Sequence, residues 1–149
     1  MVSLGSKMLV TQTTGCLPTG DSVTRSCARV YEVNNGTNKV KTLTISASGT
    51  YYFYPAATFA GKNVGVAVGS SGPTLPSLNA TAGPWGQALA APAVVAAGTA
   101  TNVTGRYGDY FAASPQPGSS TVFWVAGEIG GTSGSTVKWN TAAGPVTIG

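Results

Sequence analysis

Residues 108–128 contain Gly108-Asp109-Tyr110-Phe111-Ala112-Ala113, then a turn, then Thr121-Val122-Phe123-Trp124-Val125-Ala126-Gly127-Glu128. An earlier stretch has the same plan, with Tyr54-Pro55-Ala56-Ala57, the turn Gly61-Lys62-Asn63, and Val64-Gly65-Val66-Ala67-Val68-Gly69. Aromatic, β-branched and small residues on both sides of a turn are typical of paired strands. Because repeated strand–turn–strand units are typical of modular β architectures, this repeat predicts the fold more directly than any local signal.

The two copies are offset by 56 residues at Tyr54 and by 58 residues at Val64, since the later turn is longer. This spacing is close to the roughly 40–50 residues of a four-stranded propeller blade with loop insertions added. The repeats are therefore expected near residues 51–105 and 106–149. The aligned positions are Tyr54 with Tyr110, Ala56-Ala57 with Ala112-Ala113, and Val68-Gly69 with Ala126-Gly127.

We expect an all-β fold made of antiparallel four-stranded sheets of propeller-blade type, in a single domain over residues 1–149. A closed ring typically has four to eight blades, and this chain has room for about two and a half. A β-sandwich is the alternative fold. In the segment 64–68, valines alternate with glycine and alanine. The small residues of that segment predict tight packing against another sheet.

Three further segments carry local signals. Residues 28–33 and 40–46 alternate as strands around the turn Asn34-Asn35-Gly36, which predicts a hairpin. Residues 70–84, with three prolines, are expected to form a loop. The one helix candidate is 88–97, which Pro92 weakens.

The chain has few charges. Only 8% of its 149 residues are charged, against roughly 25% in typical soluble proteins, while 42% are hydrophobic, which argues against disorder. The net charge of +4 comes from scattered bases with no basic run, so nucleic acid is not an expected partner. The longest apolar run is too short to span a bilayer. A surface of hydroxyls and amides suits contact with glycans or with identical neighbours.

The two cysteines, Cys16 and Cys27, enclose ten residues rich in turn formers, which predicts a disulfide across a surface loop. Two unpaired buried thiols are the alternative. A disulfide is typical of an extracellular or cell-surface protein. The glycosylation sequons have the pattern Asn-x-Ser/Thr and begin at Asn35, Asn79 and Asn102. With no histidine and two cysteines, no metal site is expected, and no cofactor is expected either.

Asp109 and Glu128 are the carboxylates nearest the repeat motifs, and they are candidates for a glycosidase pair. Arg106 is a candidate for holding a substrate carboxylate. The structural interpretation is favoured, in which Asp109 pairs with Arg106 and Glu128 caps a strand end. Because the chain has no histidine, nucleophilic triads are excluded in their usual forms. Catalysis is therefore the less favoured expectation.

Tryptophans are the candidates for stacking on a sugar ring. Trp85 lies in the loop Gly83-Pro84-Trp85-Gly86 and is the best single ligand-contact residue in the sequence. Anchoring of the loop is the structural alternative for the same residue. Trp124 lies between Phe123 and Val125 and is expected to belong to the core.

Three motifs occur in order in the second copy: Gly105-Arg106-Tyr107-Gly108-Asp109-Tyr110, Phe123-Trp124-Val125-Ala126-Gly127-Glu128 and Trp139-Asn140-Thr141. With these motifs the chain resembles the C-terminal region of secreted microbial sialidase-like (BNR-type) β-propellers, over residues 27–149. Residues 52–71 are similar to the preceding blade. The resemblance implies propeller blades and secretion. The Asp-box pattern of true sialidases is absent, so the resemblance implies no particular reaction.

Three functions follow as expectations. The first is an extracellular, non-enzymatic binding or surface module with a glycan as its partner. The second is a fragment of a glycoside-processing, sialidase-like enzyme. The third is a structural subunit of a surface filament or sheath that self-associates through open sheet edges.

Overall fold

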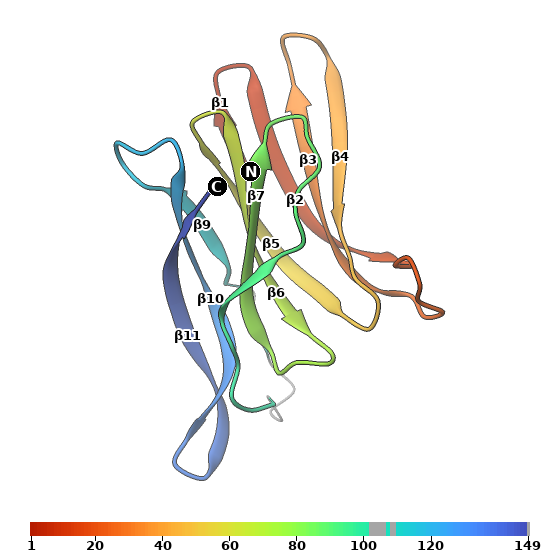
Figure 1. Cartoon of the computed structure of the whole chain (residues 1–149), viewed down its shortest axis with the longest axis vertical. Helices are drawn as coiled ribbons and strands as arrows, with labels where there is room; N and C mark the ends of the chain where they lie inside the picture. The colour runs from red at the N-terminus through yellow and green to blue at the C-terminus, as the bar shows by residue number, and fades with distance from the viewer. Residues whose placement is uncertain (102–106, 108–109, 149) are drawn as a thin grey trace.

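The computed structural model describes residues 1–101, 107 and 110–148. Within these ranges the chain forms three antiparallel sheets and no helix (Figure 1). None of the three sheets closes into a barrel. The expectation of an all-β fold of antiparallel sheets is therefore confirmed.

Each sheet follows the order of the chain. The first sheet contains β1 (Val2–Leu4), β2 (Lys7–Cys16), β3 (Arg25–Asn34) and β4 (Lys39–Ile45). The middle sheet contains β5 (Tyr51–Ala60), β6 (Asn63–Ser71), β7 (Ser77–Pro84) and β8 (Ala93–Ala96). The last sheet contains β9 (Ala112–Pro115), β10 (Val122–Ser133) and β11 (Thr136–Thr147), with β10 in its centre.

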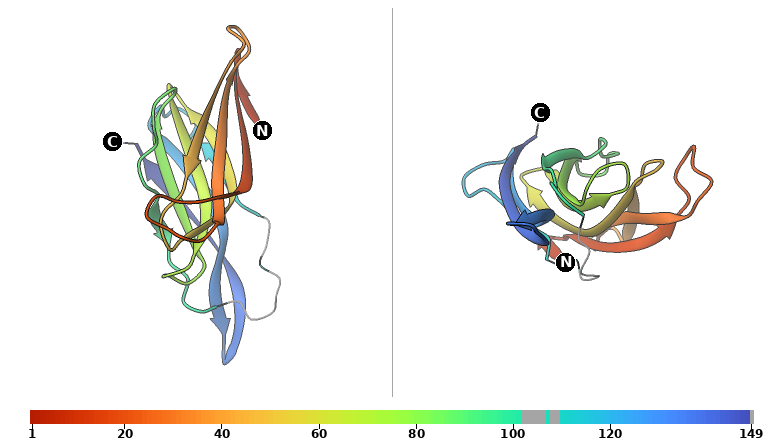
Figure 2. Two further views of the ribbon diagram at one scale, coloured as in Figure 1. Left: turned by 90° about the vertical axis from the view of Figure 1, so that its right-hand side faces the viewer. Right: turned by 90° about the horizontal axis from the view of Figure 1, so that it is seen from below.

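The middle sheet lies between the other two, so both of its faces are covered (Figures 1 and 2). Its first face packs against the first sheet, and its second face packs against the last sheet. The buried residues of the first core are Leu9, Ala28, Val30, Leu43, Ile45, Tyr52, Phe59, Val64, Val66 and Val68. The buried residues of the second core are Ala60, Ala67, Leu78, Ala80, Phe123 and Val125.

Strand β6 shows why the middle sheet can be buried on both faces. Its valines, including Val66, point toward the first sheet and are fully buried. The intervening small residues point toward the last sheet and leave room for aromatic rings. A Cβ atom on Gly65 would lie 2.7 Å from ring carbons of Phe123, and one on Gly69 would lie 2.9 Å from Phe111. The predicted tight packing on the small-residue face is confirmed.

Gly65→Ala is expected to lower the free energy of unfolding by about 2 kcal/mol, because the added methyl overlaps the Phe123 ring. Chemical denaturation measures the change. Gly15→Ala is the matched control, since its Cβ would meet only Thr24 Cγ2 at 3.5 Å, an ordinary contact. The control should change stability by less than about 0.5 kcal/mol. Equal losses in the two variants would contradict the close approach of the sheets.

The strand pairing corrects the alignment of the two sequence repeats by one residue. Ala57 pairs with Val66, and Ala113 pairs with Val125. Because Ala57 is equivalent to Ala113, their strand partners Val66 and Val125 are also equivalent. The sequence alignment had matched the second strand of the first copy to residues one position earlier in the second copy. A shift of one residue moves a side chain to the other face of a sheet. In the corrected register, Val66 and Val125 both face the preceding sheet, so the two copies stack in the same direction.

The predicted disulfide between Cys16 and Cys27 is confirmed, and it joins the end of β2 to the beginning of β3. Asp21 holds the enclosed loop in place. Its carboxylate accepts hydrogen bonds from the Arg25 guanidinium and from the backbone N–H of Gly49 at 2.9 Å. These bonds lower the pKa of Asp21 well below its usual range.

Several local expectations are wrong. The segment 70–84 contains β7 in place of a continuous loop, and the helix candidate 88–97 contains β8. In both cases pairing within the middle sheet overrides the local signals of proline and alanine. The hairpin over residues 28–46 is confirmed, because β3 pairs with β4 across the expected turn.

Candidate functional site

The structure places only part of the proposed carboxylate site. Asp109, Arg106 and the sequon residue Asn102 lie outside the described residues. Glu128 is 4% exposed and lies within β10, so the expectation that it caps a strand end is wrong. Its backbone carbonyl accepts a hydrogen bond from the hydroxyl of Tyr107. Burial, followed by the charge of Glu128, raises the pKa of that hydroxyl above its usual range.

Trp85 follows the end of β7 and packs against the first core. Its ring lies 5.6 Å from the ring of Phe59, centroid to centroid, and the Lys7 ammonium lies 5.1 Å from the Trp85 ring centroid. Its backbone N–H donates to the carbonyl of Lys62 at 3.0 Å. These contacts show Trp85 as an anchor of its loop, which was the structural alternative for this residue.

Trp124 was expected in the core, and that expectation is wrong. The side chain is 46% exposed, and its indole N–H donates to Gln116 Oε1 at 3.2 Å. Phe123 and Val125, its neighbours in β10, are the residues buried against the middle sheet. Three consecutive apolar residues do not reveal which face is buried, because alternate residues of a strand point to opposite faces.

The sequons that the structure describes differ in exposure. Asn35 is exposed in the turn between β3 and β4. Asn79 is 4% exposed within β7, and its amide donates to Ser70 Oγ at 2.6 Å and to the carbonyl of Ser77 at 3.2 Å. An attached glycan needs a surface position, which Asn35 offers and Asn79 does not.

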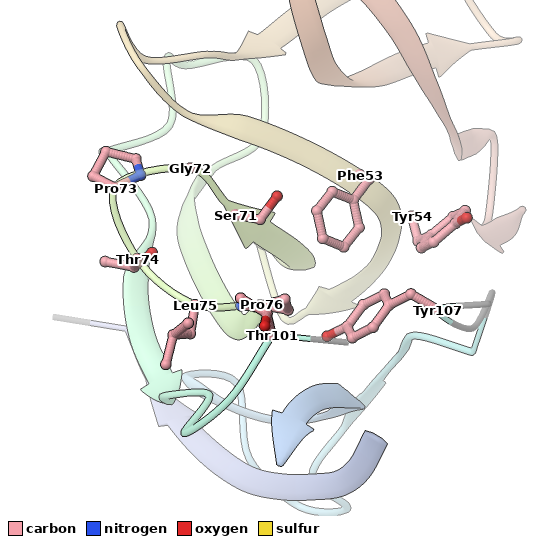
Figure 3. A pocket seen from close by; sticks show the side chains of 10 residues that line it. All are labelled: Phe53, Tyr54, Ser71, Gly72, Pro73, Thr74, Leu75, Pro76, Thr101 and Tyr107. Carbon is pink, nitrogen blue, oxygen red and sulfur yellow. The ribbon is translucent and has the colours of Figure 1, made fainter. Parts of the chain in front are cut away.

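A hollow lies where β5 bends, and we call it the aromatic pocket. Its volume is about 540 Å³. Figure 3 shows the rings of Phe53 and Tyr107 across from the loop that follows β6. The described residues that line it are Phe53, Tyr54, Ser71, Gly72, Pro73, Thr74, Leu75, Pro76, Thr101 and Tyr107.

Tyr54 sets the shape of the pocket through an uncommon backbone conformation. Its φ of 51° lies in the left-handed region, which costs a non-glycine residue on the order of 1 kcal/mol or more. The strand register shifts between Phe53 and Ala56, so Tyr54 lies in a bulge. Its backbone N–H, freed from the ladder, donates to Thr13 Oγ1 of the first sheet at 2.9 Å. The bulge turns the aromatic side chains of β5 toward the pocket.

The rings of the aromatic pocket hold one another edge to face. The centroid of Phe53 lies 5.6 Å from that of Tyr107, with the planes 86° apart, and 6.4 Å from that of Phe111. Such pairs are favourable beyond their buried area and fix ring orientation. Among the described lining residues no side chain is charged, and the polar side-chain groups are the hydroxyls of the residues Tyr54, Ser71, Thr74, Thr101 and Tyr107. The described lining therefore offers aromatic faces and hydroxyl groups to a ligand.

A smaller hollow of about 250 Å³ surrounds a buried acid. Glu32 is 2% exposed, and its Oε2 accepts the backbone N–H of Gly86 at 2.9 Å. Burial raises the pKa of Glu32, while the hydrogen bond from Gly86 and then the charges of Lys41 and Lys7 oppose that rise. No hydrogen-bond partner of Oε1 is present in the described part of the chain. The signal in the sequence for this buried acid is the alternation that puts Glu32 on the same side of β3 as Ala28 and Val30.

No family model, curated protein or solved structure matches this chain. The described residues contain no group of three or more metal-ligating side chains close enough to hold an ion. No helix in this described part of the chain is long and apolar enough to cross a membrane. The interpretation of the aromatic pocket therefore depends on its own geometry.

Proposed function

We propose that this protein is a non-enzymatic binding module whose aromatic pocket takes an uncharged sugar ring. The observation that supports this is the combination of preset aromatic rings, neighbouring hydroxyls and uncharged described side chains in one concave site. Small-ligand sites are mostly apolar hollows of roughly 300–1,000 Å³ with a few placed polar groups. A sugar presents an apolar C–H face to an aromatic ring and hydroxyls to the rim.

The disulfide supports an extracellular or cell-surface location, since disulfides persist mainly in oxidising compartments. A glycan is a ligand available there. Binding would not require a large rearrangement, because the edge-to-face contacts already hold Phe53 and Tyr107 in place. A preformed site loses less conformational entropy when it binds a ligand.

Leu75→Trp is expected to abolish binding of neutral oligosaccharides, because the larger ring fills the pocket from its loop side. Leu75 is 36% exposed and lines the pocket, so the variant should fold normally. Tyr107→Leu should weaken binding by about tenfold through loss of one aromatic face. An array of neutral oligosaccharides selects the probe, and isothermal titration calorimetry with that probe measures the affinity.

Leu17→Trp is the matched control, since Leu17 is 64% exposed in the disulfide loop and does not line the pocket. The control should bind the selected oligosaccharide as tightly as the parent chain. No binding of any neutral oligosaccharide at millimolar concentration would overturn the proposal. Equal binding by Leu75→Trp and Leu17→Trp would show that the sugar binds elsewhere.

A further inference from the structure

The outer face of the last sheet, which points away from the middle sheet, carries an apolar surface. Residues opposite one another in antiparallel strands share a face. Trp124 is opposite Pro145, and Ala126 is opposite both Ala112 and Ala143. Trp124 is 46% exposed, and all of these residues except the half-buried Ala126 are exposed. We call this surface the trailing face.

The outer face of the first sheet is also apolar. Val10 is opposite Tyr31, and Val33 is opposite both Met8 and Val40. Val40 is 62% exposed, and the other four are half-buried. None of the five belongs to the core between the first and middle sheets. We call this surface the leading face.

The stacking inside the molecule shows which way each face would dock. In the corrected repeat register, Trp124 and Ala126 are equivalent to Gly65 and Ala67. In the middle sheet those positions are covered by the next sheet along the chain, through Phe123. The trailing face of the last sheet therefore corresponds to the face of the middle sheet that the last sheet covers.

We propose that the trailing face docks against the leading face of a second copy of this chain. The contact continues the stack in which the middle sheet packs on the first and the last sheet packs on the middle (Figure 2).

The proposed contact joins two different faces, so it repeats until a ring closes or a fibre grows. Two copies supply six sheets, which lies within the roughly four to eight sheets of closed β rings. The trailing face of each copy then covers the leading face of the other, so both of these apolar faces are buried in each copy. We therefore expect a closed pair with twice the 14.8 kDa mass of one chain.

Native mass spectrometry and sedimentation over a range of concentrations test the pair. Ala143→Arg on the trailing face and Val40→Asp on the leading face should each raise the dissociation constant by about tenfold or more, since each buries an unpaired charge. Val94→Arg is the control, because Val94 is 56% exposed in β8, outside both faces, and it should leave the pair intact. Thermal unfolding checks that all three variants are folded.

Mixing the two variants distinguishes a contact between the trailing and leading faces from a contact between two identical faces. Ala143→Arg keeps an intact leading face, and Val40→Asp keeps an intact trailing face, so the mixture should form a mixed dimer through one contact. A parent chain that stays monomeric at every concentration would overturn the proposal. So would an open polymer, a pair that survives both variants, or two variants that fail to associate on mixing.

Discussion

Phe123→Ala is expected to lower the free energy of unfolding by about 4 kcal/mol. Phe123 is fully buried, and its ring lies against the bare backbone of Gly65 in the middle sheet. Removing the ring leaves a cavity between two sheets whose backbones cannot close over it. Urea unfolding, followed by circular dichroism in dilute solution, measures the change.

Trp124→Ala is the matched control for that prediction, because Trp124 is the next residue of β10 and points to the opposite face. Its removal from an exposed position should cost less than about 1 kcal/mol. The comparison separates the two faces of one strand with aromatic residues of similar size. A Trp124→Ala loss as large as that of Phe123→Ala would contradict the register of the last sheet.

Removal of the disulfide is expected to lower the free energy of unfolding by about 3 kcal/mol. The bond between Cys16 and Cys27 closes a loop with a sequence separation of 11, and cutting it returns conformational entropy to the unfolded chain. The Cys16→Ala/Cys27→Ala variant and the reduced parent chain should lose similar amounts. The Asp21 contacts to Arg25 and Gly49 should keep the loop in place in the folded state.

Dithiothreitol provides the control for this second prediction. The reductant should destabilise the parent chain and leave the double variant unchanged. A loss below about 1 kcal/mol in the double variant would show that the unfolded chain is already restricted without the bond. The same result would weaken the inference of an oxidising compartment, because the bond would then add little.

Much of the fold was predictable, because its signals are local or repeat along the chain. The alternation of valine with glycine and alanine in 64–68 predicted tight packing of the small-residue face of β6 against another sheet, and the structure confirms it. The turn at 34–36 predicted the pairing of β3 with β4. The spacing of Cys16 and Cys27 predicted their disulfide.

The candidate site was less predictable, because it depends on segments that meet only in space. The aromatic pocket combines a bulge in β5, the loop after β6 and Tyr107, which lies more than 50 residues after Phe53 in the sequence. The left-handed conformation of Tyr54 has no signal in its residue type, since tyrosine disfavours it. Trp85, the residue singled out from the sequence, packs against Phe59 instead of lining the pocket.

The pattern of residues was sufficient for the class of fold, the strand–turn–strand repeat and the disulfide, since each depends on neighbours along the chain. It was insufficient for the side of β10 that becomes core, because Phe123, Trp124 and Val125 are all apolar. The packing of the sheets decides which side of β10 is core. The face of β6 that carries glycine and alanine has room for the ring of Phe123, so Trp124 lies on the outside. The one-residue correction to the repeat has the same origin, because the face of a side chain depends on the pairing of strands across a sheet.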